Sequence, residues 1–488
     1  MKRHILLSLL LLVCLFVVGC TNNSTTKEKD TTTKNDNTST NTEEEPKQEL
    51  LDESYNLDYE SEKEFVVYPY GGVPGKLNIY DKNGNVVESN VPISDEKLLE
   101  YYTQIKEAGF TVTTGGYINM TIDDYRRALP VCEQLGLKMM IYDGTLVNLL
   151  MDQKRTDGVV VDDILNRYED IFNSPAFYGI EVDDEPTPAE LSGFKTALRR
   201  WQFLCPDKMF YINLFPSIAF SSSSDGNFET YIQKFCEEVD VDYVCYDHYP
   251  LQYGREGNYL RDDFLYNLVT CQLNSRDRRH FTVLQSIKYG GLHRELQSSR
   301  DVTFQAYSAI ACGYEGFGWF CFWPPVPFDG ATHFGDGSYD RITNEPTDSY
   351  YYIKDGLNEI RKLEDVFFNF TWEGINTVIG EKNDFGGENT DFMYSTKAVV
   401  ESERIESIKT EQDTLVGIFK DAQGNDGFMV VNFTEPSLDN TNKVTIKFKD
   451  CTKVAVWVDG EQKVYSVTDG TFVFTQSSGD GYFIVPIK

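Results

Sequence analysis

The chain has 488 residues, which is long enough for two or three domains with their own hydrophobic cores. Its 77 acidic residues outnumber the 45 basic residues and give a formal charge of −32. This excess argues against nucleic acid or an anionic membrane surface as a partner, because both need a basic protein face. It is compatible with a neutral ligand such as a sugar, and an aromatic content of 14% supplies rings that can stack on sugars or fill a core.

Residues 1–20 have the architecture of a secretion signal, with a basic start and an apolar stretch over 5–18. The segment ends in Val-Val-Gly-Cys, which resembles the bacterial lipobox, in which the cysteine is diacylated and becomes the mature N-terminus. We therefore expect a lipoprotein anchored through Cys20 at the extracytoplasmic face of the cell membrane. An ordinary signal peptide and an uncleaved anchor are the alternatives. No later segment reaches the roughly 20 apolar residues of a transmembrane helix.

Residues 21–60 are rich in Thr, Asn, Lys, Asp and Glu and poor in aliphatic residues. A segment of this composition cannot bury enough apolar surface to offset the entropy lost on ordering. The sequence therefore predicts a disordered polar tether between the lipid anchor and the folded part of the chain.

From residue 65 onward, a short apolar run alternates eight times with an amphipathic helical segment. The predicted strands are 65–70, 111–115, 138–142, 176–182, 209–214, 241–246, 280–285 and 316–323. The predicted helices are 95–108, 122–135, 160–172, 188–204, 228–238, 262–274, 299–312 and 349–363. Eight such units predict an α/β fold, a (β/α)8 TIM barrel, over residues 61–365. A doubly wound sheet is the alternative, but no glycine-rich phosphate loop follows the first strand.

Beyond residue 365 the helical period disappears, and polar and apolar residues alternate between turn signals. The expected strands are 414–419, 427–433, 443–448, 452–458, 471–475 and 481–485. This pattern predicts an antiparallel β-sandwich over residues 366–488.

Polar and aromatic side chains follow the predicted barrel strands, whose carboxyl ends meet at one face. Such a mixture can hydrogen-bond sugar hydroxyls, stack on sugar rings and cleave an acetal. The candidate residues are Asp143, Asp183, Asp184, Glu185, Asn213, Asp247, His248, Tyr249, Gln285, Tyr289, Trp319 and Trp323. Histidines and acids do not cluster at metal-ligand spacing, so we expect no metal and no other cofactor.

The stretch 176–186, AFYGIEVDDEP, carries a resemblance to clan A glycoside hydrolases, whose fourth strand ends in (Asn/Asp)-Glu-Pro. Residues 246–250 resemble a substrate-lining segment of such barrels, and residues 316–320 resemble their eighth strand. The likeness is greatest to family 42 β-galactosidase-like proteins and related barrels with a "DEP" motif. It implies that Glu185 is a general acid/base and that the partner is a carbohydrate.

The chain departs from this family at the seventh strand, which ends in Gln285 where the clan has a nucleophilic glutamate. Another carboxylate could serve, with Asp247 as the first candidate and Asp143 as the second; a pair about 5–5.5 Å apart implies retention and about 6.5–9.5 Å inversion. Substrate-assisted catalysis, with Gln285 or Tyr289 orienting the substrate, is a further possibility. The sequence thus predicts a glycoside hydrolase-like lipoprotein acting on a neutral oligosaccharide or polysaccharide. The alternative is a non-catalytic surface glycan-binding lipoprotein.

Several candidates also have a purely structural interpretation. Asp143 precedes a glycine and can form a turn, and the acids before Pro186 can cap the following helix. Trp319 and Trp323 can line the barrel mouth or fill the core. Asp183 lies two residues before Glu185, and its like charge is expected to raise the pKa of Glu185 and keep it protonated as an acid.

Overall fold

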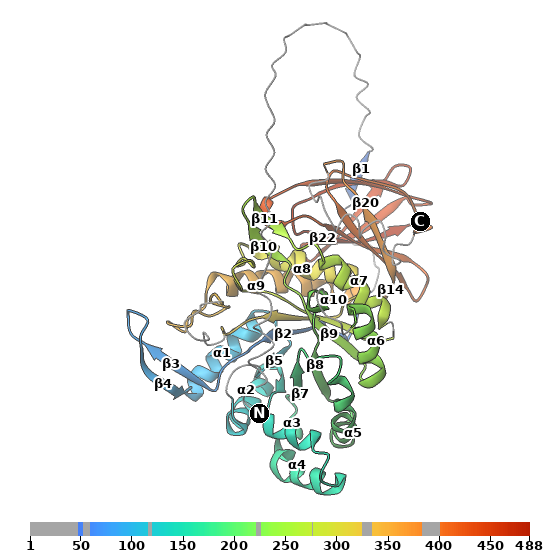
Figure 1. The fold of residues 1–488 in the computed structure, drawn as a ribbon. Helices are drawn as coiled ribbons and strands as arrows, with labels where there is room; N and C mark the ends of the chain where they lie inside the picture. The colour runs from blue at the N-terminus through green and yellow to red at the C-terminus, as the bar shows by residue number, and fades with distance from the viewer. Residues whose placement is uncertain are drawn as a thin grey trace, which may run out of the picture. The chain divides into compact units, whose positions relative to one another are not determined.

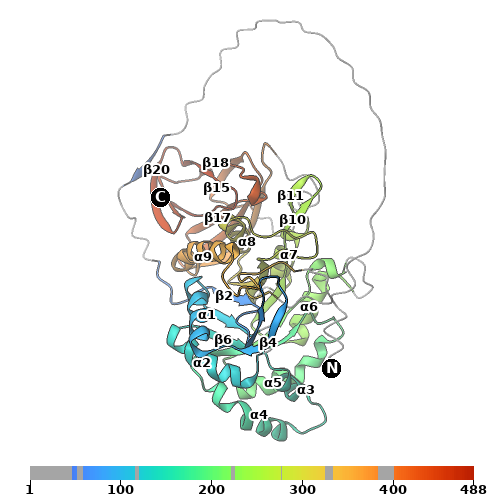
Figure 2. The same ribbon diagram turned by 90° about the vertical axis from the view of Figure 1, so that its left-hand side faces the viewer.

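The computed structural model describes residues 47–51, 59–115, 120–220, 226–275, 277–324, 334–382 and 401–488. Residues 46–488 belong to one compact unit (Figures 1 and 2). The predicted signal segment with Cys20, and most of the predicted tether, lie outside the described residues. In the part of the chain that is described, no helix has the length and apolar character needed to cross a membrane.

Eight parallel strands form two four-stranded sheets, ordered β5-β6-β7-β8 and β2-β13-β12-β9. The strands are β2 (Val66–Tyr70), β5 (Val112–Thr114), β6 (Lys138–Ile141), β7 (Phe177–Asp184), β8 (Met209–Asn213), β9 (Tyr243–Asp247), β12 (Arg279–Gln285) and β13 (Gly316–Phe320). The sheet edges meet through backbone bonds, from Thr111 N–H to Val67 O at 3.0 Å and from Leu214 N–H to Cys245 O at 2.9 Å. This mixed α/β arrangement is consistent with a TIM-barrel-type fold.

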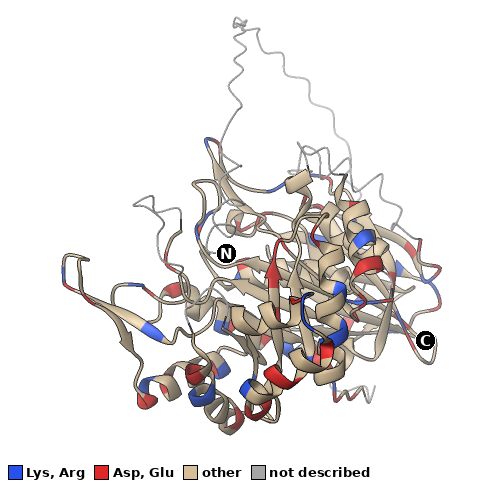
Figure 3. Ribbon diagram, turned by 60° about the horizontal axis from the view of Figure 1, so that its bottom comes forward, with Lys and Arg blue, Asp and Glu red and all other residues tan. Residues whose placement is uncertain are grey.

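Helices alternate with these strands along the chain. They are α1 (Asp95–Glu107), α2 (Ile122–Leu135), α3 (Gly144–Met151), α4 (Asp157–Phe172), α5 (Phe194–Leu204), α6 (Phe228–Glu238), α7 (Phe264–Asn274), α8 (Ser299–Ala311), α9 (Asp348–Ile360) and α10 (Glu364–Phe367). Short 3-10 turns are η2 (Leu191–Gly193), η3 (Ser217–Phe220), η4 (Arg361–Leu363) and η5 (Pro436–Leu438). Along the outer helices Lys and Arg lie beside Asp and Glu (Figure 3), as in the ion pair of Arg126 with Asp170 at 2.7 Å.

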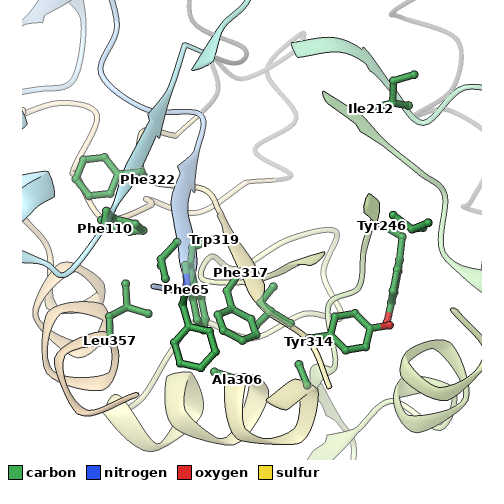
Figure 4. Close-up of a cluster of buried hydrophobic side chains, with 14 of the residues drawn as sticks. Phe65, Phe110, Ile212, Tyr246, Ala306, Tyr314, Phe317, Trp319, Phe322 and Leu357 are labelled. Atoms are coloured by element: carbon green, nitrogen blue, oxygen red, sulfur yellow. The ribbon is translucent and has the colours of Figure 1, made fainter. Parts of the chain in front are cut away.

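Side chains on the parallel strands alternate between an inner and an outer cluster. Tyr68, Tyr211, Tyr243 and Phe281 belong to the inner one. Gly318 lies on this face because a Cβ there would come within 2.6 Å of the Tyr68 ring. Its neighbour Trp319 therefore faces outward, into the cluster that Figure 4 shows with Phe65, Phe317 and Leu357.

Two short hairpins interrupt the strand–helix rhythm and were not expected from the sequence. One is β3 (Lys76–Tyr80) with β4 (Val86–Pro92), and the other is β10 (Leu251–Gly254) with β11 (Gly257–Leu260). Helix α3 was not expected either. The β10–β11 hairpin matters for the site, because it directly follows the carboxyl end of β9.

The C-terminal part consists of two antiparallel sheets, ordered β1-β20-β19-β22-β17-β16-β14 and β15-β18-β21. The strands are β14 (Phe370–Val378), β15 (Ile405–Thr410), β16 (Thr414–Asp421), β17 (Asp426–Asn432), β18 (Asn442–Phe448), β19 (Lys453–Val458), β20 (Glu461–Val467), β21 (Thr471–Gln476) and β22 (Gly481–Ile487). Strand β1 (Gln48–Leu51) lies in the predicted tether, yet it pairs with β20. Its backbone completes the edge of the sheet, which composition alone does not reveal.

Helix α8 packs against β16, β17 and β22, so the parallel strands and the C-terminal sheets share a core. A buried ion network crosses the same boundary. Arg294, 2% exposed, bonds both Asp301 and Glu435, which are 0% and 3% exposed. Because Glu435 follows β17, the C-terminal part is tied to the segment after β12.

Candidate functional site

Strand β7 delivers Glu185 to the carboxyl end of the parallel strands. The strand runs to Asp184, and Glu185 then takes a positive φ of 56°, which L residues other than Asn and Asp seldom adopt. Its backbone N–H donates to Asn213 O at 2.8 Å, so the turn is held against the end of β8. Residues held in such a sparsely populated backbone conformation cluster at functional sites.

Hydrogen bonds link the acids at the strand ends. The Tyr70 hydroxyl, from β2, lies 2.9 Å from Asp184 Oδ1 and 3.2 Å from Glu181 Oε1. Asn213 Nδ2, from β8, lies 3.0 Å from Asp184 Oδ1 and 3.4 Å from Asp247 Oδ1. Tyr70 thus joins two carboxyl groups of β7, and Asn213 of β8 connects Asp184 of β7 with Asp247 of β9.

The environment of these acids favours their protonated forms. Burial and the negative charges of Asp247 and Asp184 raise the pKa of Glu185 well above its usual value. Burial and the charge of Asp184 raise the pKa of Asp247 to about 7, although hydrogen bonds from Tyr249 and Asn213 act to lower it. Burial also raises the pKa of Asp183 to about 6. Glu185 and Asp247 therefore titrate as an interacting pair.

Aromatic rings pack against one another at and beyond the carboxyl ends of β9, β12 and β13. Tyr249 follows β9, and its ring stacks on Phe320 with centroids 5.4 Å apart. Tyr289 stacks on His293 at 5.2 Å and on Phe334 at 5.0 Å. The charges of Glu185 and Asp247 contribute to the raised pKa of Tyr289, which shows that this ring lies near both acids. We call these five residues the aromatic wall.

Gln285 lies at the carboxyl end of β12 but is occupied by backbone contacts. Its Oε1 accepts from Leu251 N–H at 2.9 Å, and its Nε2 donates to Leu251 O at 3.0 Å and to Arg294 O at 2.8 Å. The amide therefore joins the start of β10 to the segment that carries His293. A glutamate could not donate the two Nε2 bonds.

His248 and Asp143 bond to nearby helices. The buried His248 lies 2.9 Å from Asp263 Oδ1, and burial lowers its pKa despite this carboxylate. Asp143 caps α3, where its carboxylate accepts from Thr145 N–H at 2.7 Å and from Leu146 N–H at 3.1 Å. Burial and a hydrogen bond to Asp143 raise the pKa of Tyr168. Both side chains are therefore engaged in hydrogen bonds that hold the local structure next to a helix.

The two tryptophans pack in the outer hydrophobic cluster. Trp319 is fully buried there, and Trp323 stacks on Tyr339 with ring centroids 4.6 Å apart. The predicted strand extends to residue 323, but β13 ends at Phe320, so Trp323 lies beyond the strand. Phe320 is the β13 ring that joins the aromatic wall.

Four further neighbours of the site are not among the candidates that the sequence analysis names: Glu181, Tyr70, Phe320 and His293. Glu181 is 5% exposed, and burial and the charge of Asp184 raise its pKa to about 8. Strand alternation could have found it, because it lies two residues after Gly179 on the inner face. His293 lies beyond the strand, so no strand pattern marks it.

The described residues hold no group of three or more His, Cys, Asp or Glu side chains arranged to bind a metal ion. The groups that the site does contain are carboxyl groups in different protonation states, an amide and aromatic rings. These groups can donate and accept protons and can bind a ring-shaped polar ligand.

No protein-family model matches the chain, and no curated protein matches it. A solved structure described as a glycoside hydrolase has a TM-score of 0.51 and 13% identity, over 86% of this chain and 92% of that chain. A glycoside hydrolase family 5 protein from Bacteroides vulgatus has a TM-score of 0.48 and 14% identity, over 84% and 94%. An Anoxybacillus alpha-amylase has a TM-score of 0.47 and 10% identity, over 87% and 98%. The first comparison shows that the chain shares its fold with a glycoside hydrolase.

Proposed function

We propose that the chain is a glycoside hydrolase that cleaves an oligosaccharide or polysaccharide without acidic groups. Glu185 is the general acid/base, and Asp247 is the second carboxylate. The observation that carries the proposal is the position of these two acids at the ends of β7 and β9, where burial and neighbouring negative charge raise both pKa values: Asp247 and Asp184 act on Glu185, and Asp184 acts on Asp247. Two carboxyl groups in different protonation states are what hydrolysis of a glycosidic bond requires.

The reaction follows from the two protonation states. Protonated Glu185 gives its proton to the glycosidic oxygen while the bond to the anomeric carbon breaks. Ionised Asp247 then either attacks that carbon or takes a proton from an attacking water. In the first case, a water activated by Glu185 releases the sugar from Asp247; in the second, the product forms directly. The aromatic wall supplies faces for the sugar ring.

A glycan-binding protein without hydrolysis is the second candidate, and Gln285 is the observation that favours it. The amide occupies the strand-seven position and is held by the Leu251 and Arg294 backbone. A binding protein needs the aromatic wall and the hydrogen-bonding groups but no nucleophile.

The finer architecture belongs to the same proposal. We interpret the eight parallel strands as a closed (β/α)8 barrel and the C-terminal sheets as a β-sandwich, because both sheets contribute to one buried cluster. The likeness to family 42 proteins with a "DEP" motif rests on Asp184-Glu185-Pro186. Anchoring through Cys20 at the extracytoplasmic face rests on the lipobox-like segment alone.

Hydrolysis of a glycan panel tests the function. We expect Glu185→Gln and Asp247→Asn each to lower kcat/KM by about 10²–10⁴-fold, because each removes a proton-transfer or nucleophilic group. Glu133→Gln is the control, since this exposed acid on α2 lies outside the site. Equal rates for the parent and Glu185→Gln contradict the acid/base role. Binding without turnover in the parent favours the second candidate.

A further inference from the structure

The candidate site holds more carboxyl groups than two-carboxylate hydrolysis uses. They are Glu181, Asp183, Asp184, Glu185 and Asp247. The Tyr70 hydroxyl is within hydrogen-bond distance of Glu181 and Asp184, and Asn213 is within that distance of Asp184 and Asp247. Three acids therefore lie beside the proposed catalytic pair without a part in the reaction.

Glu181 shows that this cluster is incomplete by itself. Its Oε2 atom is buried and has no hydrogen-bond partner within the described ranges, and the residue is 5% exposed. Its Oε1 shares the Tyr70 hydroxyl with Asp184, so the carboxyl group points into the cluster. A buried oxygen without a partner loses its bonds to water and gains none in return, which disfavours the folded state. A ligand that donates a hydrogen bond to it removes this cost.

No described basic side chain offsets the burial of Glu181, Asp183 and Glu185. The causes that shift the pKa of Glu181, Asp183 and Glu185 include burial and neighbouring acids, and no basic side chain of the described chain contributes. A bound cation would compensate both the burial and the repulsion between the acids. The same described carboxylates are not grouped as a metal ion needs them, which favours an organic cation.

The aromatic wall fits such a ligand. Tyr289 lies near Glu185 and Asp247, and Tyr249 stacks on Phe320 beside it. Ring faces attract ammonium groups and pack on the C–H faces of sugars, while carboxylates accept the ammonium hydrogens. A sugar ring that carries an ammonium group can pack on the aromatic wall and donate hydrogen bonds to the carboxylates.

We propose that the site prefers a glycan with unsubstituted amino groups, a hexosamine oligosaccharide, whose ammonium group binds between Glu181 and Asp184. The glycan part of this inference rests on the proposed function, but the preference for the amine concerns binding and does not require cleavage.

The affinity has a predictable pH dependence. Glu181 and Asp247 have pKa values of about 8 and 7, so raising the pH from 5 to 7 increases their negative charge, and binding of the ammonium group strengthens. Asp183, with a pKa of about 6, gains negative charge over the same range, whereas His293, with a pKa of about 4, stays neutral. Burial raises the pKa of the thiol of Cys245 and of the phenols of Tyr125, Tyr142, Tyr231 and Tyr289, which therefore also stay neutral.

Calorimetric titration of the full chain carrying Glu185→Gln tests the inference without turnover. The ligands are the trisaccharides of glucosamine and of N-acetylglucosamine. We expect the amine to bind at least about tenfold more tightly at pH 7. This advantage should shrink at pH 5 and at high salt. Adding Glu181→Gln should remove most of the advantage, while adding the control Glu133→Gln should not.

Glu181→Gln is suited to this role because the amide cannot ionise beside an ammonium group, while its oxygen can still accept from Tyr70. Asp184→Asn is a second variant with the same expected result if the first does not fold. Equal affinity for the two trisaccharides, or an advantage that survives both variants, overturns the inference. Competition by Ca²⁺ overturns it in favour of a metal site. Hydrolysis of uncharged glycans by the parent would leave the proposed function standing in each case.

Discussion

At the scale of single residues, Glu185 and Asp247 determine the expected pH profile of activity. Asp247 has to be ionised and Glu185 protonated, so kcat/KM rises as the pH passes about 7 and falls again when Glu185 loses its proton. We expect a bell-shaped profile with its maximum at or above pH 7. Rates measured between pH 5 and 10 on the best glycan check this. A profile that is flat between pH 5 and 7 would argue against Asp247.

Glu181 gives a second prediction at this scale, for stability. Its pKa rises from 4.5 in the unfolded chain to about 8 in the folded chain, so the folded state binds the proton more tightly. Its contribution to stability is therefore greatest below pH 4.5 and is lost as the pH rises through about 8. We expect the gap in Tm between Glu181→Gln and the parent to grow in favour of the variant from pH 5 to 8. A constant gap contradicts this reading.

At the scale of elements, Gln285 shows how the end of β12 is used. Its amide fixes the start of β10 and Arg294, and with them the neighbouring Tyr249 and His293. Gln285→Glu removes two donors and introduces a buried charge, so we expect a loss of at least about 1–3 kcal/mol in stability. It should not create a retaining enzyme. Denaturation and glycan assays measure both effects, with the exposed Gln297→Glu as the matched control. A gain of retaining activity would show that the position is a vacant nucleophile site.

At the scale of the whole molecule, Arg294 couples the C-terminal sheets to the site. Glu435 and Asp301 neutralise this buried guanidinium, and the Arg294 backbone lies beside His293 of the aromatic wall. Glu435→Ala leaves part of the charge unpaired, and we expect about 3–5 kcal/mol of destabilisation in urea unfolding. The exposed Glu461→Ala is the control. Similar stability of both variants would mean that Asp301 alone compensates Arg294.

The sequence alone determined the helices with strong local signals. The predicted and observed bounds are identical for α2 and α6, because Thr121 with Asp124 and Asn227 with Thr230 form capping boxes. The sequence also located the eight parallel strands, because a strand that is buried on both faces is a continuous run of apolar residues. The two added hairpins and strand β1 were missed, because their residues are largely exposed and their pairing depends on partners elsewhere in the chain.

Tertiary structure decided what the side chains at the strand ends contact. The sequence brought Glu185 and Asp247 to one face, but it could not show that Gln285 and His248 are bonded to other segments. It could not show Glu181 as a buried acid with an open oxygen either. Local patterns fix the direction in which a strand residue points, whereas hydrogen-bond partners and electrostatic surroundings arise only when distant strands and loops come together.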